Sequence, residues 1–103
     1  MNRVYRLYVG ARNTANRTFS PRDIEVMEAV LNRYFMGWTC VSSTGCWNGK
    51  TEESRIITVT TDGIQQGQLV GKTPIQSCAN QLMGHFKQDA VMLEEGGNVS
   101  ILT

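Results

Sequence analysis

The chain has 103 residues and a net charge of +1, with 41% hydrophobic and 18% charged residues. This composition excludes a disordered or fibrous protein, and no run of Lys and Arg with interleaved aromatic residues marks a nucleic-acid-binding surface. We therefore expect one domain spanning residues 1–103 with a modest core, which gains from self-association, and no nucleic-acid partner.

The cysteines and the N-terminus indicate the compartment. Cys40, Cys46 and Cys78 form an odd set without a Cys-x-x-Cys pair, and the single His85 adds no zinc-ligand spacing. The N-terminal MNRVYRLYVG has no apolar core typical of a signal peptide, and no stretch approaches the roughly 20 apolar residues of a membrane span. We expect a soluble cytoplasmic protein, in the host cytoplasm if a phage encodes it, without membrane contact, metal or cofactor.

The first third of the chain predicts a strand, a loop and a helix. Residues 4–9 are β-branched and aromatic, and Gly10 ends this strand. Residues 11–19 are rich in Asn and Arg and predict an exposed, mobile loop, whose Arg12 and Arg17 are positioned to reach an anion. The helix begins at a capping sequence and ends at a glycine. The capping sequence is Ser20-Pro21-Arg22-Asp23, and Gly37 is the expected end. The apolar stripe between them consists of Ile24, Met27, Val30, Leu31, Tyr34 and Phe35.

Two strands follow, joined by the most unusual stretch of the chain. Residues 38–42 predict a short strand, and residues 55–61 predict the clearest strand, closed by Asp62-Gly63. The stretch Ser42 to Ile57 holds hydroxyls, two glycines, an indole and two adjacent carboxylates. We interpret it as a connection and as the segment favoured to contact a ligand.

The last third predicts a long loop, a helix and two strands. Residues 62–73 carry three glycines and predict a moving flap. Gly71-Lys72-Thr73 departs from a phosphate-binding P-loop, which needs a glycine where this chain has Gln66. The second helix begins at Thr73-Pro74 and runs through Phe86. Strands over 90–93 and 99–102 flank a turn over 94–98.

This order, β-α-β-β-α-β with an additional terminal strand, predicts a ferredoxin-like α+β sandwich with both helices on one face of an antiparallel sheet. The other face carries Tyr8 and alternating apolar residues, and Trp38 adds to them. We expect that face to be buried against another copy of the chain.

Glu52 and Glu53 are neighbours, so in a strand they point to opposite faces and do not share a proton. For every candidate residue in this stretch, a purely structural role stays open. The glutamates could be two exposed carboxylates at the start of a strand, and Trp47 could anchor a loop by packing over it. The sequence Ser42-Ser43-Thr44-Gly45 is also typical of a turn.

The segment Ser42-Ser43-Thr44-Gly45-Cys46-Trp47, followed by Thr51-Glu52-Glu53, resembles two elements of the phage S-adenosylmethionine (SAM) lyases, formerly described as hydrolases. The likeness extends loosely over the whole chain, from an early V-Y-x-L-Y-V strand to the closing acidic-to-apolar strand. It implies a trimer with active sites between subunits. It also implies a lyase that cleaves SAM to methylthioadenosine and homoserine lactone, used by phages against SAM-dependent restriction and modification.

The resemblance also implies residue roles. Glu53, or Glu52, would match the functional glutamate and hold the substrate ammonium, and Trp47 falls where the family has a tyrosine. Trp47 or Trp38 would lie near the sulfonium or adenine. The remaining implied substrate contacts are Ser42, Ser43, Thr44, Gly45 and Tyr8. The substrate carboxylate is the nucleophile, so neither an enzymic nucleophile nor a metal is required.

Two other functions fit the same sequence. One is a non-catalytic ferredoxin-like oligomer that binds a nucleotide or a host protein, and the other is a purely structural oligomer. The chain also resembles an uncharacterised bacterial family with an early L-Y-x-G strand and a Trp, Gly, Glu, Ser run like Trp47, Gly49, Glu53 and Ser54, which implies no function.

Overall fold

The computed structural model describes residues 3–11, 15–60, 74–88 and 91–102. Its elements, in chain order, are β1 (Val4–Gly10), the short 3₁₀ helix η1 (Ala15–Arg17), α1 (Pro21–Tyr34), β2 (Thr39–Trp47), β3 (Lys50–Thr60), α2 (Pro74–Phe86), β4 (Val91–Glu95) and β5 (Asn98–Leu102).

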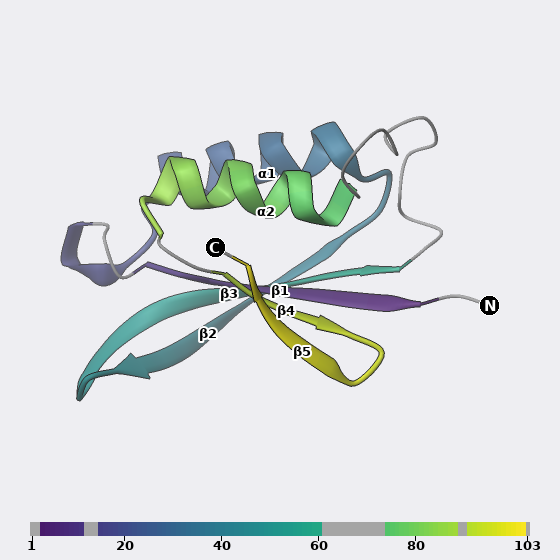
Figure 1. Cartoon of the computed structure of the whole chain (residues 1–103). Helices are drawn as coiled ribbons and strands as arrows, with labels where there is room; N and C mark the ends of the chain where they lie inside the picture. Colours follow the sequence, from purple (N-terminus) through teal and green to yellow (C-terminus); the bar gives the residue numbers. More distant parts are fainter. Residues whose placement is uncertain (1–2, 12–14, 61–73, 89–90, 103) are drawn as a thin grey trace.

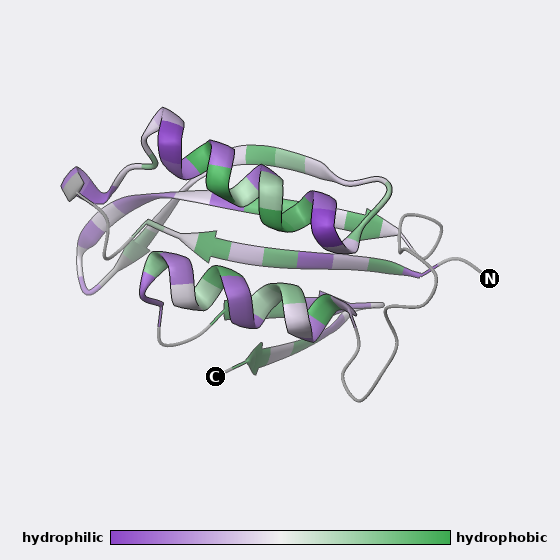
Figure 2. Ribbon diagram, turned by 90° about the horizontal axis from the view of Figure 1, so that it is seen from above, coloured by the Kyte–Doolittle hydropathy of each residue, from purple (hydrophilic) through white to green (hydrophobic). Residues whose placement is uncertain are grey.

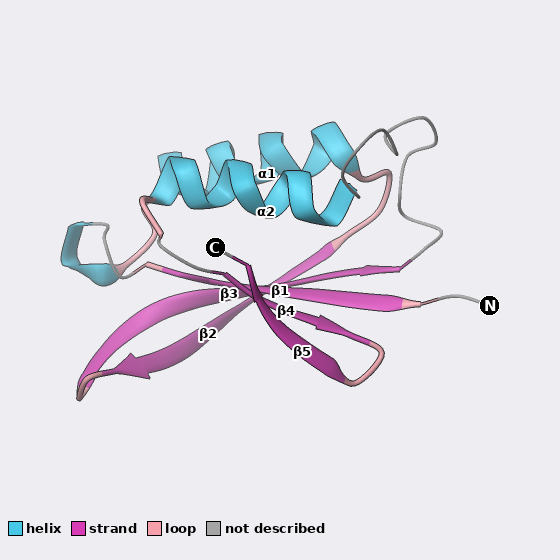
Figure 3. Ribbon diagram, viewed as in Figure 1, coloured by secondary structure: helices cyan, strands magenta, loops and turns pink. Residues whose placement is uncertain are grey.

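The strands form one antiparallel sheet in the order β2-β3-β1-β4-β5. Both α-helices cover the same face of this sheet, so the molecule has two layers (Figures 1 and 3). This arrangement confirms the ferredoxin-like α+β sandwich, with β5 as the additional strand beside β4. We call the face opposite the helices the open face.

The core lies between the helices and the sheet. Each helix places its apolar residues at spacings of three and four, which forms one buried stripe per helix. Figure 2 shows the two helices side by side above the sheet. The buried residues of this layer include Met27, Val30, Leu31, Ile75, Cys78, Leu82 and Phe86 from the helices and Leu7, Val9, Ile57 and Val59 from the strands. The predicted stripe of α1 is confirmed.

The predicted start of α1 is confirmed, but its predicted end is wrong. The Ser20 hydroxyl accepts a hydrogen bond from the Asp23 N–H at 3.1 Å, and the Asp23 carboxylate accepts one from the Ser20 N–H at 2.9 Å. This reciprocal capping box satisfies two N–H groups that a helix start leaves open. The helix ends at Tyr34 rather than near Gly37, because Phe35 adopts an extended backbone and buries its ring in the core.

The stretch between β2 and β3 is a long hairpin and not a connecting loop, which corrects our sequence-based interpretation. Only Asn48 and Gly49 form the turn, with φ of 51° and 75°. Asn-Gly suits a two-residue turn because both residues tolerate positive φ. The hydroxyls and carboxylates of this stretch therefore belong to paired strands. The last hairpin is likewise tighter than expected, since only Gly96 and Gly97 lie between β4 and β5.

The predicted exposed loop over 11–19 is wrong at two positions. Ala11 and Phe19 are buried, and the Phe19 ring packs edge-on against Phe86, with ring centroids 5.3 Å apart. This contact holds the segment before α1 against α2. The expected flap over 62–73, the cap at Thr73 and Arg12 lie outside the described residues.

The hairpin turn gives a direct test of the fold. We expect Gly49→Ala to lower the free energy of unfolding by about 1 kcal/mol, because a Cβ is strained at positive φ even where, as here, it meets no atom. Gly84→Ala, in α2 and equally unobstructed, should instead raise it by about 0.5 kcal/mol through helix propensity. Urea denaturation of both variants measures this, and equal effects would contradict the assigned turn.

Candidate functional site

The hairpin brings the two unusual sequence elements into direct contact. Its register pairs Thr44 with Glu53, Gly45 with Glu52 and Cys46 with Thr51. Residues in register on neighbouring strands lie side by side on the same face of the sheet. The two elements therefore form one surface across β2 and β3.

Alternation along the strands divides this surface between the two faces of the sheet. Glu53 lies four residues before the buried Ile57 in β3, so both side chains point to the helix-side face. Their cross-strand partners put Ser42 and Thr44 on the same face, since Thr44 pairs with Glu53 and Ser42 pairs with the residue two positions further along β3. Ser43, Gly45 and Glu52 lie on the open face. The two glutamates consequently serve different environments, as their adjacency in a strand predicts.

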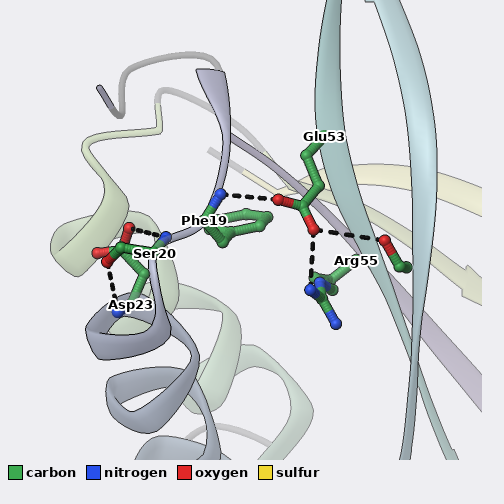
Figure 4. A network of polar contacts seen from close by, with 6 residues as sticks. Phe19, Ser20, Asp23, Glu53 and Arg55 are labelled. Carbon is green, nitrogen blue, oxygen red and sulfur yellow. Dashed lines mark hydrogen bonds and ion pairs between the residues drawn. The ribbon is translucent and has the colours of Figure 1, made fainter. Parts of the chain in front are cut away.

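Glu53 is held by three donors on the helix side. Its Oε1 accepts a hydrogen bond from the Phe19 N–H at 2.8 Å, and its Oε2 accepts from Arg55 at 2.8 Å and from the Ser42 hydroxyl at 3.3 Å (Figure 4). Its backbone oxygen also accepts from the Ala11 N–H at 2.8 Å. This one residue thus fastens both ends of the segment between β1 and α1 to the hairpin.

The surroundings of Glu53 favour its charged form. The Phe19 N–H is the main cause that lowers the pKa of Glu53, and Arg55 and Ser42 lower it further against the opposing effect of burial. The side chains of Glu53 and Arg55 are only 20% and 22% exposed. An ion pair this sheltered from water, with additional hydrogen bonds, contributes to folding more than exposed pairs do.

Arg55 and Cys40 extend this network along the hairpin. Burial raises the pKa of the Cys40 thiol, and the neighbouring Arg55 partly opposes that effect. Arg55 Nε is buried and has no hydrogen-bond partner within the described part of the chain. The guanidinium is therefore fixed mainly through Glu53, and the whole group is suited to holding the hairpin in place.

Glu52 lies on the open face between two glycines. A Cβ on Gly10 would come within 2.6 Å of Glu52 Oε1, and a Cβ on Gly45 would lie 3.8 Å from Glu52 Cγ. The carboxylate therefore lies against Gly10, the last residue of β1, where any larger residue would displace it. Gly10 is needed here for close approach and not for an unusual φ.

Tyr8 and Glu94 form a second polar group on the open face. The Tyr8 hydroxyl donates to Glu94 Oε1 at 2.9 Å, and Arg6 donates to Glu94 Oε2 at 3.1 Å. The hydrogen bond to Glu94 is the main cause that raises the pKa of Tyr8, followed by burial and the charge of Glu94. The tyrosine is thus protonated and oriented, two residues along β1 from Gly10.

Of the two tryptophans predicted near a substrate, Trp38 is not brought together with Glu53. Trp38 precedes β2, packs against the core and donates through its indole N–H to Asn32 at 2.9 Å. By strand rise it lies about 16 Å or more along the hairpin from the Thr44 to Glu53 pair. Trp47 is the last residue of β2, opposite Lys50, and its side chain lies outside the described part of the structure.

Among the described residues, no three His, Cys, Asp or Glu side chains group to hold a metal ion. His85 is exposed near the end of α2. No described helix is long and apolar enough to cross a membrane.

Comparison with solved structures finds the same fold in a phage enzyme. The chain matches a phage SAM lyase in complex with S-methyl-5′-thioadenosine with a TM-score of 0.63 and 19% identity, covering 99% of this chain and 89% of the other. It matches a phage SAM lyase in the apo state with a TM-score of 0.62 and 20% identity, covering 98% and 88%. No family model and no curated protein matches the sequence. The chain therefore shares the fold of these lyases.

Sequence reasoning missed Gly10, Arg6 and Glu94 as members of the open-face group. The missing signal was register, because Gly10 is far in sequence from Glu52 and Arg6 is far from Glu94, and each pair meets only across neighbouring strands. Tyr8 was found, but without its partner. Ser42 and Ser43 were predicted to act together, yet strand alternation separates them onto opposite faces.

The Glu53 network predicts a pH-dependent contribution to stability. We expect Glu53→Gln to lower the free energy of unfolding by about 1–3 kcal/mol at neutral pH, because it removes the charge from three hydrogen bonds. Since folding depresses the pKa of Glu53 below its ordinary value of 4.5, this contribution is complete above that pH. It is lost as the pH falls through the folded-state pKa.

Denaturation from pH 7 to pH 3 checks this expectation. The stability difference between the natural protein and Glu53→Gln should shrink towards acid, whereas the exposed Glu25→Gln should change little at any pH. A difference that stays constant with pH would contradict the assigned role of the Glu53 charge.

Proposed function

We propose that this protein is a SAM lyase that converts SAM to methylthioadenosine and homoserine lactone. The observation that carries the proposal is the direct pairing of its Thr-Gly-Cys-Trp and Thr-Glu-Glu elements, with Gly45 opposite Glu52. Both elements resemble the lyases, and they meet in a chain whose fold matches a phage SAM lyase bound to S-methyl-5′-thioadenosine.

The proposed reaction needs no nucleophile from the protein. An oxygen of the substrate carboxylate forms a bond to the γ-carbon, the bond from that carbon to sulfur breaks, and its electron pair leaves with sulfur. The sulfonium becomes a neutral thioether, and the carboxylate becomes the lactone. The site must fold the methionyl chain into this geometry and exclude water. Because opposite charges disappear in the step, a partly apolar, preorganised site accelerates it.

We assign the ammonium anchor to Glu52 in preference to Glu53. The Glu53 carboxylate faces the helices, where Phe19, Ser42 and Arg55 donate to it. Glu52 instead lies on the open face, the same face as Tyr8, and is placed by the glycines beside it. A carboxylate so positioned can hold the substrate ammonium and leave the methionyl chain to cross β1.

The open face also supports the proposal of a homo-oligomer, with a trimer favoured by the resemblance. Val41, Val99 and Ile101 are large apolar residues of this face that remain 48%, 61% and 59% exposed in one chain. An apolar patch of this kind favours burial against a second copy. A neighbouring subunit would then close the site beside Glu52. Removal of SAM by such an enzyme would deprive host restriction and modification systems of their methyl donor.

Charge on the open face should weaken self-association. We expect Ile101→Lys to shift the protein towards smaller species, because a buried ammonium without a partner is costly. Met36→Lys is the matched control, since Met36 is 68% exposed but lies between α1 and β2. Sedimentation velocity measures both variants. A natural protein that is monomeric, or an Ile101→Lys variant with unchanged mass, would contradict the proposed interface.

Incubation of the purified protein with SAM tests the activity. We expect methylthioadenosine and homoserine lactone by chromatography, and Glu52→Gln should lower kcat/KM by about 10- to 100-fold through loss of a charged hydrogen bond to the ammonium. Gly10→Ala should act in the same direction, because its Cβ displaces the Glu52 carboxylate. Glu25→Gln should retain full activity.

The outcomes separate the candidate functions. No product from the natural protein would overturn the lyase, and tight binding of SAM without turnover would favour the non-catalytic binding module. Product formation that depends on Glu53 but not on Glu52 would contradict the assignment of the anchor.

A further inference from the structure

The open face holds one aromatic ring that is oriented by its own polar partners. Tyr8 is half-buried on the central strand β1, and its hydroxyl donates to Glu94 at 2.9 Å. Arg6 occupies the other oxygen of Glu94 at 3.1 Å. Because Arg6 and Tyr8 each bind one oxygen of Glu94, the Tyr8 hydroxyl is held in place. The positive charge of Arg6 also offsets the negative charge of the Glu94 carboxylate.

This ring lies close to the proposed ammonium anchor. Tyr8 and Gly10 point to the same face of β1 and are about 7 Å apart along the strand. The Glu52 carboxylate lies over Gly10, within 2.6 Å of where its Cβ would be. The ammonium and the sulfonium of a methionyl chain are separated by three carbon atoms, so a chain held at Glu52 reaches the ring.

We propose that Tyr8 is the aromatic partner of the substrate sulfonium, with Glu94 and Arg6 as its positioning residues. A cation is attracted to the face of an aromatic ring within about 6 Å of its centre. Donation of the hydroxyl hydrogen to a carboxylate polarises the phenol and makes its ring more electron-rich. The inference rests on the proposed function, because the sulfonium is a feature of that substrate.

Tyr8 also fills a role that Trp38 does not fill in one chain. Trp38 is packed against the core and bonded to Asn32, away from Glu52. The sequence places a tryptophan at position 47 where the resembling lyases have a tyrosine. A tyrosine hydroxyl nevertheless lies on the face that carries Glu52, supplied by β1 instead of β2.

Two unreactive analogues isolate the contact with the cation. Sinefungin carries a charged amine at the position of the sulfonium, whereas S-adenosylhomocysteine carries a neutral thioether, and both keep the ammonium and adenosine. We expect the natural protein to prefer sinefungin and Tyr8→Leu to lose about 5- to 30-fold of this preference, measured by isothermal titration calorimetry. Tyr8→Phe and Glu94→Gln should give intermediate ratios, because the ring remains but is no longer polarised.

Two controls separate this role from others. Glu52→Gln should weaken both analogues equally, since both carry the ammonium. Tyr5→Phe, on the same strand but packed against the core, should leave the ratio unchanged. An unchanged ratio in Tyr8→Leu, an equal loss for both analogues, or no binding of either by the natural protein would overturn the proposal. The ratio is measured without turnover, so the lyase assay reports separately on the proposed function.

Discussion

The register of the β2 and β3 hairpin is the constraint on which the rest of the site depends. Asn48 and Gly49 both adopt positive φ, and this two-residue turn fixes which residues stand opposite each other. A slip of one residue would exchange the two faces of the hairpin. Glu53 would then leave its donors, and Glu52 would enter the layer beneath the helices.

The adjacent carboxylates of Glu52 and Glu53 therefore point to opposite faces of the sheet and have different roles. Glu53 faces the helices, where the Phe19 N–H and Arg55 satisfy it and lower its pKa. Glu52 faces away from the helices, where its position is set by the glycines of neighbouring strands. The first arrangement stabilises the loop before α1 against the hairpin. The second places a carboxylate on the face of the sheet that the two described α-helices do not cover.

Local signals predicted most of the fold, whereas long-range pairing decided the site. The capping box at Ser20 and the stripe of α1 depend on residues within a few positions, so sequence spacing was sufficient. The hairpin was misread because its polar side chains resemble those of a loop, although Asn48-Gly49 already indicated a two-residue turn. That turn alone implies the pairing of Gly45 with Glu52. The contact of Tyr8 with Glu94 joins residues 86 positions apart and needs the strand order.

The comparison of position 47 with Tyr8 shows why a site in a sheet is better described by face than by motif. Side chains on one face of three neighbouring strands lie within reach of one another, whichever strand supplies each group. In the proposed site, a phenol that β2 lacks can be supplied by β1, provided that alternation directs it to the same side. In this chain Gly10 leaves room for Glu52, and Tyr8 lies two residues before Gly10. Under the proposed function, the phenol that one motif lacks is thus supplied by the surface that the motif helps to form.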